Sequence, residues 1–525
     1  MPEVSVLAPR RVLSCILAGM KTKAPAAILV ITGFLVAVLF TPSPTYAAGD
    51  GKVSPWVAAA TAAGGTTEIL VVLTEQADLA AAAAVPDLTA RRRAVRDVLW
   101  ETAQRSQQGL RAWLDARGVR YRSFSIVNAL HVSGADAALV AALAARPDVA
   151  RIETNPRIRQ QLPLTKAATG GNQPESIEWN VNLVRATEMW AAGFTGQGIV
   201  LGNQDTGFQW DHPALRNQYR GWSGTAADHD YNWHDAIHSG GGVCGPNSPI
   251  PCDDYGHGTL TVGVSIGSDG GANQIGVAPG ARWIGCRNMD HGWGTPATYL
   301  ECLEFFLAPY PVGGTPAQGD PARAPDVTNN SWLCPPEEGC SWDTLQAAIE
   351  AQRAAGILTV VAAGNSGPSC STVQDPPAIY DAAFSVGATD AGDNIASFSS
   401  LGPVTVDGSN RLKPDISAPG DNIRSSAPGG DYASASGTSL AAPHVAGAVA
   451  LLWSASPALK GRVDATERAL ASSAVPRFSS QCGDPGDAVP NNVFGWGRLD
   501  AMAAYAIFAD GFESGDPWAW STINP

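Results

Sequence analysis

The chain has 525 residues, of which 45% are hydrophobic and 16% are charged, a composition typical of folded domains and not of disordered chains. This length predicts more than one domain. The formal net charge of −14 argues against a general nucleic-acid binder, which would need a basic surface.

The first 48 residues have the features of an export signal. Lys21 and Lys23 precede an apolar run from Ala24 to Phe40, and small residues follow this run up to residue 48. We therefore expect residues 1–48 to be a signal peptide and the mature protein to be secreted and extracellular, without membrane attachment after signal removal. Retention of the apolar run as a membrane anchor is the alternative.

Charge is unevenly distributed along the chain. Residues 1–48 contain four basic residues and one acidic residue, residues 49–165 contain 14 basic and 11 acidic residues, and residues 166–525 have a net charge of −20. A basic N-terminal region in front of an acidic body predicts two modules that attract each other. Two surfaces that are simply solvated are the alternative.

Residues 66–160 have the pattern of a small α+β domain. Helical and strand periodicities predict strands at Glu68–Leu73, Tyr121–Val132 and Val149–Ile152 and helices at Leu88–Ala116 and Ala135–Ala145. This order predicts helices on one face of an antiparallel sheet. The polar stretch from Gln160 to Pro174 then predicts a linker.

Short apolar strands alternate with helices over the rest of the chain. We predict strands at Ile199–Asn203, Trp283–Cys286, Val327–Thr328, Ile357–Ala362 and Phe384–Val386, and helices at Pro296–Phe306, Ser341–Ala355 and Leu440–Ser454. This alternation predicts an α/β fold, a parallel sheet with helices on both faces. In such a sheet, reactive groups collect at the carboxyl ends of the strands.

Eight of the nine cysteines follow residue 240, and the ninth, Cys15, falls within the signal. An even number of cysteines in an exported chain predicts disulfides. The spacing suits small loops closed by Cys244 with Cys252 and by Cys334 with Cys340, and leaves the other pairings open. No Cys-x-x-Cys pair occurs, and we predict no metal site.

Four segments contain residues suited to nucleophilic catalysis. Asp205 follows a predicted strand, His257 lies between two glycines, Asn365 follows another strand, and Ser439 lies at a predicted helix start, beside unpaired N–H groups. Each alone has an ordinary structural explanation, such as a turn residue or a helix N-cap. Together, in this order, the four segments strongly indicate nucleophilic catalysis. His444 is expected to be structural, because the helix carries it away from Ser439.

With stretches such as Asn273–Gly280 and Lys413–Gly420, these segments resemble the subtilases, the subtilisin-like serine peptidases, and among them the bacillopeptidase F branch. The resemblance covers about residues 176–507 and implies a subtilisin-like peptidase domain over residues 166–507. Residues 49–165, with a core at 66–160, look like the inhibitory propeptide of the family. Residues 508–525 remain as a short aromatic, acidic and glycine-rich tail.

The resemblance implies a role for each of these residues. His257 would take the proton of Ser439, Asp205 would orient the imidazole, and Asn365 would stabilise the oxyanion. An extended peptide would pair with a cleft formed by Gly292, Trp293, Gly294, Ser331, Trp332, Leu333 and Gly364. The implied activity is that of a secreted, self-processed serine endopeptidase that forms an acyl-enzyme on protein and peptide substrates. Its own propeptide would act as an intramolecular inhibitor, and a monomer is expected.

The sequence also bears on substrate specificity and on cofactors. The sequence places no acidic residue in the first pocket, so we expect broad cleavage with an apolar preference; Asp253 and Asp254 favour basic substrate groups as the alternative. No cofactor is expected for catalysis. A calcium-ligand Asp of the family matches Ala214 here, so structural calcium is possible elsewhere in the chain but is not predicted. Leu260 and Leu440 replace a histidine and a methionine that the family usually has.

Two rival hypotheses accompany this interpretation. One is an inactive binding protein that has kept the fold, which would need a broken catalytic set. The other is a proprotein-processing peptidase with narrow basic specificity. An adhesion role for the tryptophan-rich tail is a further alternative for residues 508–525 alone.

Overall fold

The computed structural model describes residues 51–160, 166–167 and 177–509. These residues belong to one compact unit, which spans Asp50–Pro525. The predicted signal peptide, most of the predicted linker and the predicted C-terminal tail lie outside the described residues. Below, residues 51–160 are called the N-terminal module and residues 177–509 the body.

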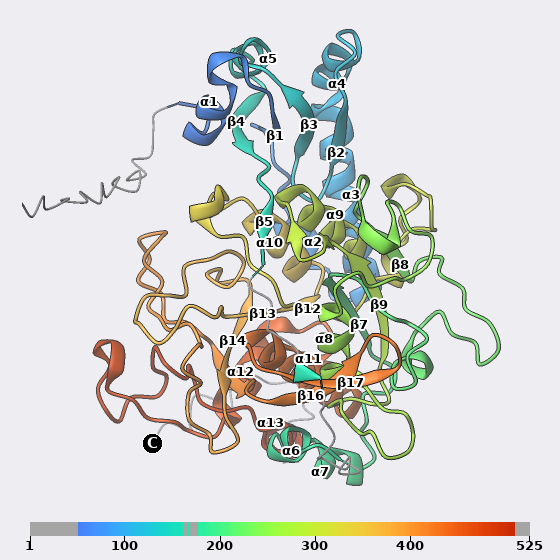
Figure 1. Cartoon of the computed structure of the whole chain (residues 1–525), viewed down its shortest axis with the longest axis vertical. Helices are drawn as coiled ribbons and strands as arrows, with labels where there is room; N and C mark the ends of the chain where they lie inside the picture. Colours follow the sequence, from blue (N-terminus) through green and yellow to red (C-terminus); the bar gives the residue numbers. More distant parts are fainter. Residues whose placement is uncertain (1–50, 161–165, 168–176, 510–525) are drawn as a thin grey trace, which may run out of the picture. The chain divides into compact units, whose positions relative to one another are not determined.

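A seven-stranded sheet organises the body (Figure 1). Its strand order is β15-β14-β13-β12-β7-β9-β8, and every neighbouring pair is parallel. The strands are β7 (Val200–Asp205), β8 (Trp233–Asp235), β9 (Arg282–Arg287), β12 (Val327–Asn330), β13 (Leu358–Ala362), β14 (Phe384–Thr389) and β15 (Ile416–Pro419). The predicted parallel sheet is confirmed. Strands β8 and β15 were not predicted, because they are short and carry too few apolar residues for a periodic signal.

Helices cover both faces of this sheet. Val360 shares a buried cluster with α11 (Thr438–Ala455), whereas the next residue, Val361, shares another with α9 (Pro296–Leu307) and α10 (Gln346–Ala354). Because successive side chains of a strand point to opposite faces, these helices lie on opposite sides. Helix α8 (His257–Ile266) packs against α11.

Helix α11 is the central helix of the body. Among the described residues it is the one helix long and apolar enough to cross a membrane by length and composition, but 89% of its apolar window is buried inside the protein. It contacts strands β12, β13, β14 and β15. These contacts explain its apolar sequence as that of a core helix.

The N-terminal module is a four-stranded antiparallel sheet with helices. Its order is β2-β3-β1-β4, with β1 (Thr67–Leu73), β2 (Tyr121–Phe124), β3 (Ala129–Ala135) and β4 (Val149–Thr154), and its main helices are α3 (Leu88–Ser106), α4 (Gln108–Asp115) and α5 (Ala137–Ala144). The predicted α+β composition is therefore confirmed.

The predictions of one helix over 88–116 and one strand over 121–132 were wrong in detail. The helix is interrupted at Gln107 and the strand by a turn at residues 125–128. The buried Gln107 amide donates hydrogen bonds to Phe124 O (2.9 Å) and Asn128 Oδ1 (2.8 Å). These long-range bonds satisfy polar groups of the turn, and a local pattern does not reveal them.

Two three-stranded sheets join early segments to the body. Strand β5 (Ile158–Arg159) pairs with β11 (Trp293–Gly294), which pairs with β10 (Met289–Asp290). Strand β6 (Lys166–Ala167) pairs with β17 (Asp431–Ala435), which pairs with β16 (Ile423–Ala427). The remaining helices are α1 (Pro55–Thr61), α2 (Ala80–Ala83), α6 (Trp179–Leu183), α7 (Ala186–Ala191), α12 (Val463–Ser473) and α13 (Ala501–Ala509).

The N-terminal module also packs on the body through its sheet. Leu70 and Phe124 belong to the same buried cluster as Tyr299 and Leu303 of α9 and Ile349 of α10. Alternate residues of the same strands, such as Ile69 and Val71, face a separate core with α4 and α5. One face of the sheet is therefore covered by α4 and α5, and the other belongs to a shared cluster that contains α3 together with helices of the body.

Four disulfides use all eight cysteines of the body. They are Cys244–Cys252, Cys286–Cys302, Cys334–Cys340 and Cys370–Cys482. The predicted disulfides are confirmed, including the two small loops. The other two pairs, which spacing left open, are set by the fold.

Loss of the Cys370–Cys482 disulfide should destabilise the protein more than loss of Cys244–Cys252. The sequence separations are 112 and 8 residues, and the chain-entropy model gives about 5 and about 2.5 kcal/mol respectively. We expect paired Cys→Ser variants to differ in this order in urea unfolding. Equal losses would contradict the entropic explanation.

Candidate active site

The parallel register brings three strand ends to one edge of the sheet. Gln204 of β7 pairs with Asn330 of β12, which pairs with Val361 of β13. Asp205 is the last residue of β7, and Ser331 directly follows β12. Asn365 follows β13 by three residues. The sheet therefore brings Asp205 to the same edge as two residues more than a hundred positions later in the sequence, as expected for the carboxyl ends of parallel strands.

His257 reaches Asp205 because α8 begins beside the end of β7. Gly256 has φ +100°, and a Cβ on Gly258 would lie 2.1 Å from Gly207 O, so this helix start needs glycine on both sides of the histidine. His257 Nδ1 lies 2.7 Å from Asp205 Oδ1, and the two side chains are 2% and 1% exposed. His257 Nε2 is buried and has no hydrogen-bond partner among the described residues. When Nδ1–H donates to the Asp205 carboxylate, the neutral ring presents Nε2 as an acceptor.

Ser439 lies in the first turn of α11 and is held by Ser331. Pro443 inside α11 has no N–H, so Ser439 O loses its helical donor. The Ser331 hydroxyl replaces that donor at 2.9 Å, and Ser439 Oγ lies 3.4 Å from Ser331 O. No hydrogen bond joins Ser439 Oγ to His257 Nε2 in the described structure. The structure thus joins Asp205 to His257 directly and places Ser439 at the start of the neighbouring helix.

Asn365 has a defined orientation. Its Oδ1 accepts hydrogen bonds from the N–H and the hydroxyl of Thr438, both at 2.9 Å. Its Nδ2 therefore remains available, and among the described residues it has no acceptor. Asn365 and Ser439 line one pocket, so a free amide donor and the first N–H groups of α11 lie beside the serine hydroxyl.

A segment of the N-terminal module lies in the predicted peptide cleft. Ile158 pairs with Gly294 and Arg159 with Trp293, and Gln160 N donates to Gly292 O at 2.9 Å. The Gln160 side chain also bonds both backbone groups of Leu333, accepting from its N–H at 2.9 Å and donating to its carbonyl. The predicted cleft residues around Gly292 and Leu333 are therefore those that contact an extended chain.

The other predicted cleft residues are close by. Ser331, Trp332, Leu333 and Gly364 line the same pocket as Ser439. Trp332 is 1% exposed and stacks on Tyr299 at a centroid distance of 4.0 Å, so its ring supports the cleft from beneath. Three members of the pocket lining, Pro335, Glu338 and Asp375, were not predicted from the sequence. No local motif distinguishes them from ordinary loop residues.

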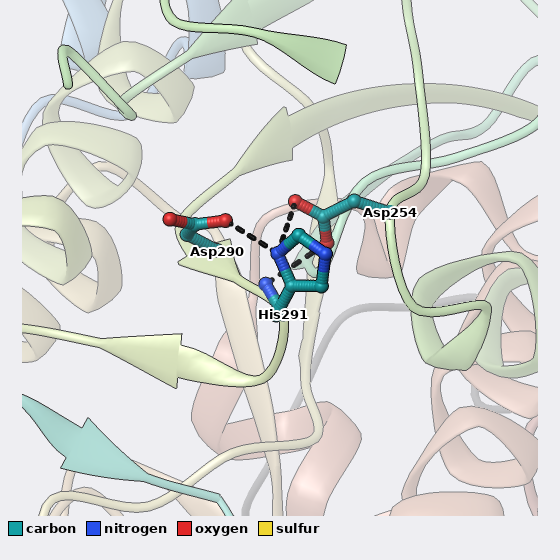
Figure 2. Close-up of side chains that lie close together, drawn as sticks. All are labelled: Asp254, Asp290 and His291. Carbon is teal, nitrogen blue, oxygen red and sulfur yellow. Dashed lines mark hydrogen bonds and ion pairs between the residues drawn. The ribbon is translucent and has the colours of Figure 1, made fainter. Parts of the chain in front are cut away.

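The side chains of Asp254, Asp290 and His291 lie close together at the turn beside the cleft (Figure 2). His291 Nδ1 lies 2.8 Å from Asp290 Oδ1, and His291 N donates to Asp254 Oδ1 at 3.0 Å. Their ligand-type atoms lie within 4.8 Å of one another, and Arg287 Nη1 lies 3.7 Å from Asp254 Oδ2. Hydrogen bonding to Asp290 raises the pKa of His291, and burial raises the pKa of Asp254 to about 6. These contacts connect the loop before His257 to the turn between β10 and β11.

Asp253 organises the approach to His257. Its Oδ1 accepts from Thr206 Oγ1, Tyr255 N and Gly256 N at 2.7–3.1 Å. Its Oδ2 accepts from Thr259 N and Thr259 Oγ1 at 2.9 and 2.6 Å. Five donors therefore converge on one carboxylate, which fixes the start of α8. The sequence predicted only an alternative role for Asp253, that of a group which favours basic substrates.

His444 lies away from the pocket. Its Nδ1 contacts Leu440 O at 2.7 Å and its Nε2 contacts Asn180 Nδ2 at 2.8 Å. Complete burial lowers the pKa of His444 to about 4. The ring is therefore neutral at ordinary pH and has a structural role.

The fold and this site together have the arrangement of a serine peptidase built on a parallel α/β sheet. The sequence model of the subtilase family matches residues 196–497. Since this match covers more than half of the chain, the protein belongs to the subtilase family, the subtilisin-type serine peptidases. Catalysis in this family uses no cofactor.

Individual relatives agree with this assignment. Bacillopeptidase F of Bacillus subtilis (strain 168) is 37% identical over 443 residues, which are 80% of this chain. Subtilisin BL of Lederbergia lenta is 32% identical over 54% of this chain and 86% of its own, and the alkaline protease of Alkalihalobacillus alcalophilus is 30% identical over 59% and 67%. The aligned part spans only 29% of the length of bacillopeptidase F.

Asp253→Asn should destabilise the protein by about 1–3 kcal/mol, because an amide nitrogen replaces an acceptor oxygen and leaves buried donors unpaired. Urea unfolding in a Ser439→Ala background measures the loss. Asp487→Asn, at an exposed position, is the matched control and should have no effect. An unchanged midpoint for Asp253→Asn would show that the five bonds do not hold the turn.

Proposed function

We propose that the protein is a secreted serine endopeptidase, acting as a monomer and made as a self-processed precursor, in which Asp205, His257 and Ser439 carry out catalysis. The observation that carries the proposal is the 2.7 Å contact between His257 Nδ1 and Asp205 Oδ1 beside a cleft that holds an extended segment of chain. The family membership supports the same reaction.

The chemistry follows from the protonation of the imidazole. Asp205 is buried and accepts from Thr206 N at 2.7 Å as well as from His257, so its carboxylate is held in place. His257 Nε2, which has no other partner, would take the Ser439 proton as the hydroxyl attacks a peptide carbonyl. The protonated imidazole, stabilised by Asp205, would then protonate the leaving amine.

The carbonyl oxygen becomes an anion during this attack. Asn365 Nδ2 and the N–H of Ser439 would donate to it, since Thr438 already occupies the Oδ1 of Asn365. Rotation of the Ser439 hydroxyl away from Ser331 O, where it lies at 3.4 Å, is needed for the reaction. Such long contacts in a resting site are compatible with catalysis, because the geometry tightens when substrate binds.

The proposed substrates are proteins and peptides bound as an added strand. Segment Ile158–Gln160 already makes main-chain bonds with β11, and a substrate would make the same bonds along Gly292, Trp293 and Gly294. Backbone pairing gives affinity without sequence selectivity, which leaves selectivity to the side-chain pockets.

Secretion is supported by the cysteines and by the apolar N-terminal run. Four disulfides close loops of 6 to 112 residues in the body, and disulfides persist in oxidising compartments outside the cytosol. The apolar run at Ala24–Phe40 provides the export signal.

The N-terminal module is proposed to be the inhibitory propeptide. Two of its arginines form ion pairs with buried acids of the body: Arg92 with Asp326 at 2.9 Å, and Arg122 with Glu301. Glu301 also contacts His234 and His238, but burial, with Arg122 nearby, lowers the pKa values of these histidines to about 3 and about 4. Arg122 is then the cation that balances Glu301 at neutral pH. This pairing supports the attraction that the charge distribution predicted.

We expect Ser439→Ala to abolish peptide hydrolysis, because it removes the nucleophile. Asn365→Ala should lower kcat by about 10²–10³ with little change in KM, the scale known from subtilisin itself. Hydrolysis of a protein substrate and labelling by a fluorophosphonate probe measure both effects. Full activity of pure Ser439→Ala protein would defeat the assignment.

Self-processing predicts a second result. Ser439→Ala precursor made in a protease-deficient host should keep its N-terminal module, whereas wild-type protein should be cut near residues 159–165, as found by mass spectrometry of the mature N-terminus. The wild-type enzyme added in trans is the control for accessibility of the site. Cleavage of the Ser439→Ala precursor at the same position in that host would mean that another peptidase does the processing.

A further inference from the structure

The pocket beside Ser439 is lined by carboxylates. Asp375 and Glu338 belong to its lining, together with neutral residues such as Asn365 and Gly364. Its one basic lining residue, Arg159, comes from the segment that lies in the cleft, and not from the body. Once that segment leaves, the lining that remains contains two acids and no cation.

Asp375 has no structural task that would explain its charge. Its carboxylate forms no hydrogen bond or ion pair with any described residue. The preceding residue, Gln374, holds this loop instead, since it donates to Pro403 O at 3.1 Å and accepts from Thr405 N and Val406 N at 3.0 and 2.8 Å. A partly buried carboxylate without a partner requires an explanation, because burial without compensation is costly.

The electrostatic surroundings make this carboxylate receptive to a cation. Burial, followed by the negative charges of Glu337 and Glu338, raises the pKa of Asp375 to about 7. Both glutamates come from the turn at Pro336–Glu338, and Glu338 Oε2 accepts from Arg159 N at 3.0 Å in the precursor. An entering guanidinium or ammonium group would relieve the repulsion and would favour the ionised form.

We propose that Asp375 makes this pocket select an arginine or lysine side chain on the residue N-terminal to the cleaved bond. The inference rests on the proposed function. If Ser439 attacks a carbonyl carbon and Asn365 binds its oxygen, the side chain of that same residue enters the pocket that these two groups line. The apolar preference expected from the sequence assumed that no acid lies there.

The rest of the cleft is compatible with cationic peptides. Arg157 and Arg159 of the bound segment lie 5.2 and 5.8 Å from the centroid of the Trp293 ring, within the range of cation–π attraction. The strongly acidic composition of residues 166–525 would also attract basic substrates. These features act along the whole cleft, whereas Asp375 acts in one pocket.

Matched peptide substrates test the proposal on the mature wild-type enzyme. Four fluorogenic peptides would differ only in the residue before the cleaved bond, which is arginine, lysine, leucine or citrulline, the neutral isostere of arginine. We expect kcat/KM for arginine to exceed that for citrulline and for leucine by about 10–100-fold, because a buried acid rejects a side chain that leaves it unpaired. Equal or faster cleavage after leucine and citrulline would overturn the proposal without any variant.

Two variants separate selection from folding. Asp375→Asn should lower kcat/KM for arginine by about 10–100-fold while the value for leucine changes by less than about threefold. Asp381→Asn is the matched control in the same loop, since its side chain is 94% exposed and does not line the pocket. Parallel loss on arginine and leucine substrates in Asp375→Asn would indicate a structural role and overturn the proposal.

The pH dependence gives a readout that a structural role would not produce. Because the pKa of Asp375 is raised to about 7, the carboxylate ionises as pH increases through neutrality. The ratio of kcat/KM for arginine to that for leucine should therefore rise between pH 6 and 8 in the wild type and stay flat in Asp375→Asn. Any effect of pH that is common to both substrates cancels in the ratio. A flat wild-type ratio would contradict the role of Asp375.

Failure of the proposed function has a different signature. A fluorophosphonate probe reports the nucleophile independently of the pocket. A protein that is neither labelled by the probe nor cleaves any of the four peptides would overturn the peptidase proposal, and the pocket proposal with it. A protein that is labelled and cleaves peptides, but prefers leucine, would overturn only the role of Asp375.

Discussion

The parallel register of β7, β12 and β13 is the constraint on which the rest of the site depends. Because Gln204, Asn330 and Val361 lie in one row, the residues that follow them leave the sheet at the same edge. Asp205, Ser331 and Asn365 are placed by this row, and α8 and α11 begin beside it with His257 and Ser439. A shift of one residue in any of these strands would turn its side chains to the other face of the sheet and separate these groups.

Three carboxylates near the cleft differ in what satisfies them, and this difference separates their roles. Asp253 receives five hydrogen bonds and holds the start of α8. Asp205 receives the Thr206 N–H and the His257 ring, which suits a group that would orient an imidazole. Asp375 receives none from the described residues, which suits a group whose partner arrives with a ligand. The number of hydrogen-bond donors around each carboxylate thus matches the structural, catalytic or selective role that we propose for it.

The N-terminal module and the body complement each other in charge and in hydrogen bonding. The module supplies Arg92 and Arg122 to buried acids of the body, and it supplies a strand to the open edge of β11. Glu338, which accepts the N–H of Arg159, and the Leu333 backbone, which bonds Gln160, are used by this segment. Removal of the segment would free these donors and acceptors, which is why we propose that the module and a peptide substrate bind the same surface.

The class of fold could be predicted from the sequence, and the same patterns singled out the residues that we propose to be catalytic. Buried parallel strands and core helices have continuous apolar patterns. The glycines around His257 and the proline after Ser439 meet local backbone requirements, which can be recognised from the sequence. Other features depend on contacts between distant segments. They are the turn at residues 125–128, the short strands β8 and β15, and the pairing of Cys370 with Cys482. The same holds for Asp375, which an ordinary loop sequence carries and which only the folding of that loop against Ser439 places in a pocket. A local sequence pattern reflects how a residue affects its own backbone. A pocket is formed by residues from separate elements, so the charge of the pocket depends on the tertiary structure.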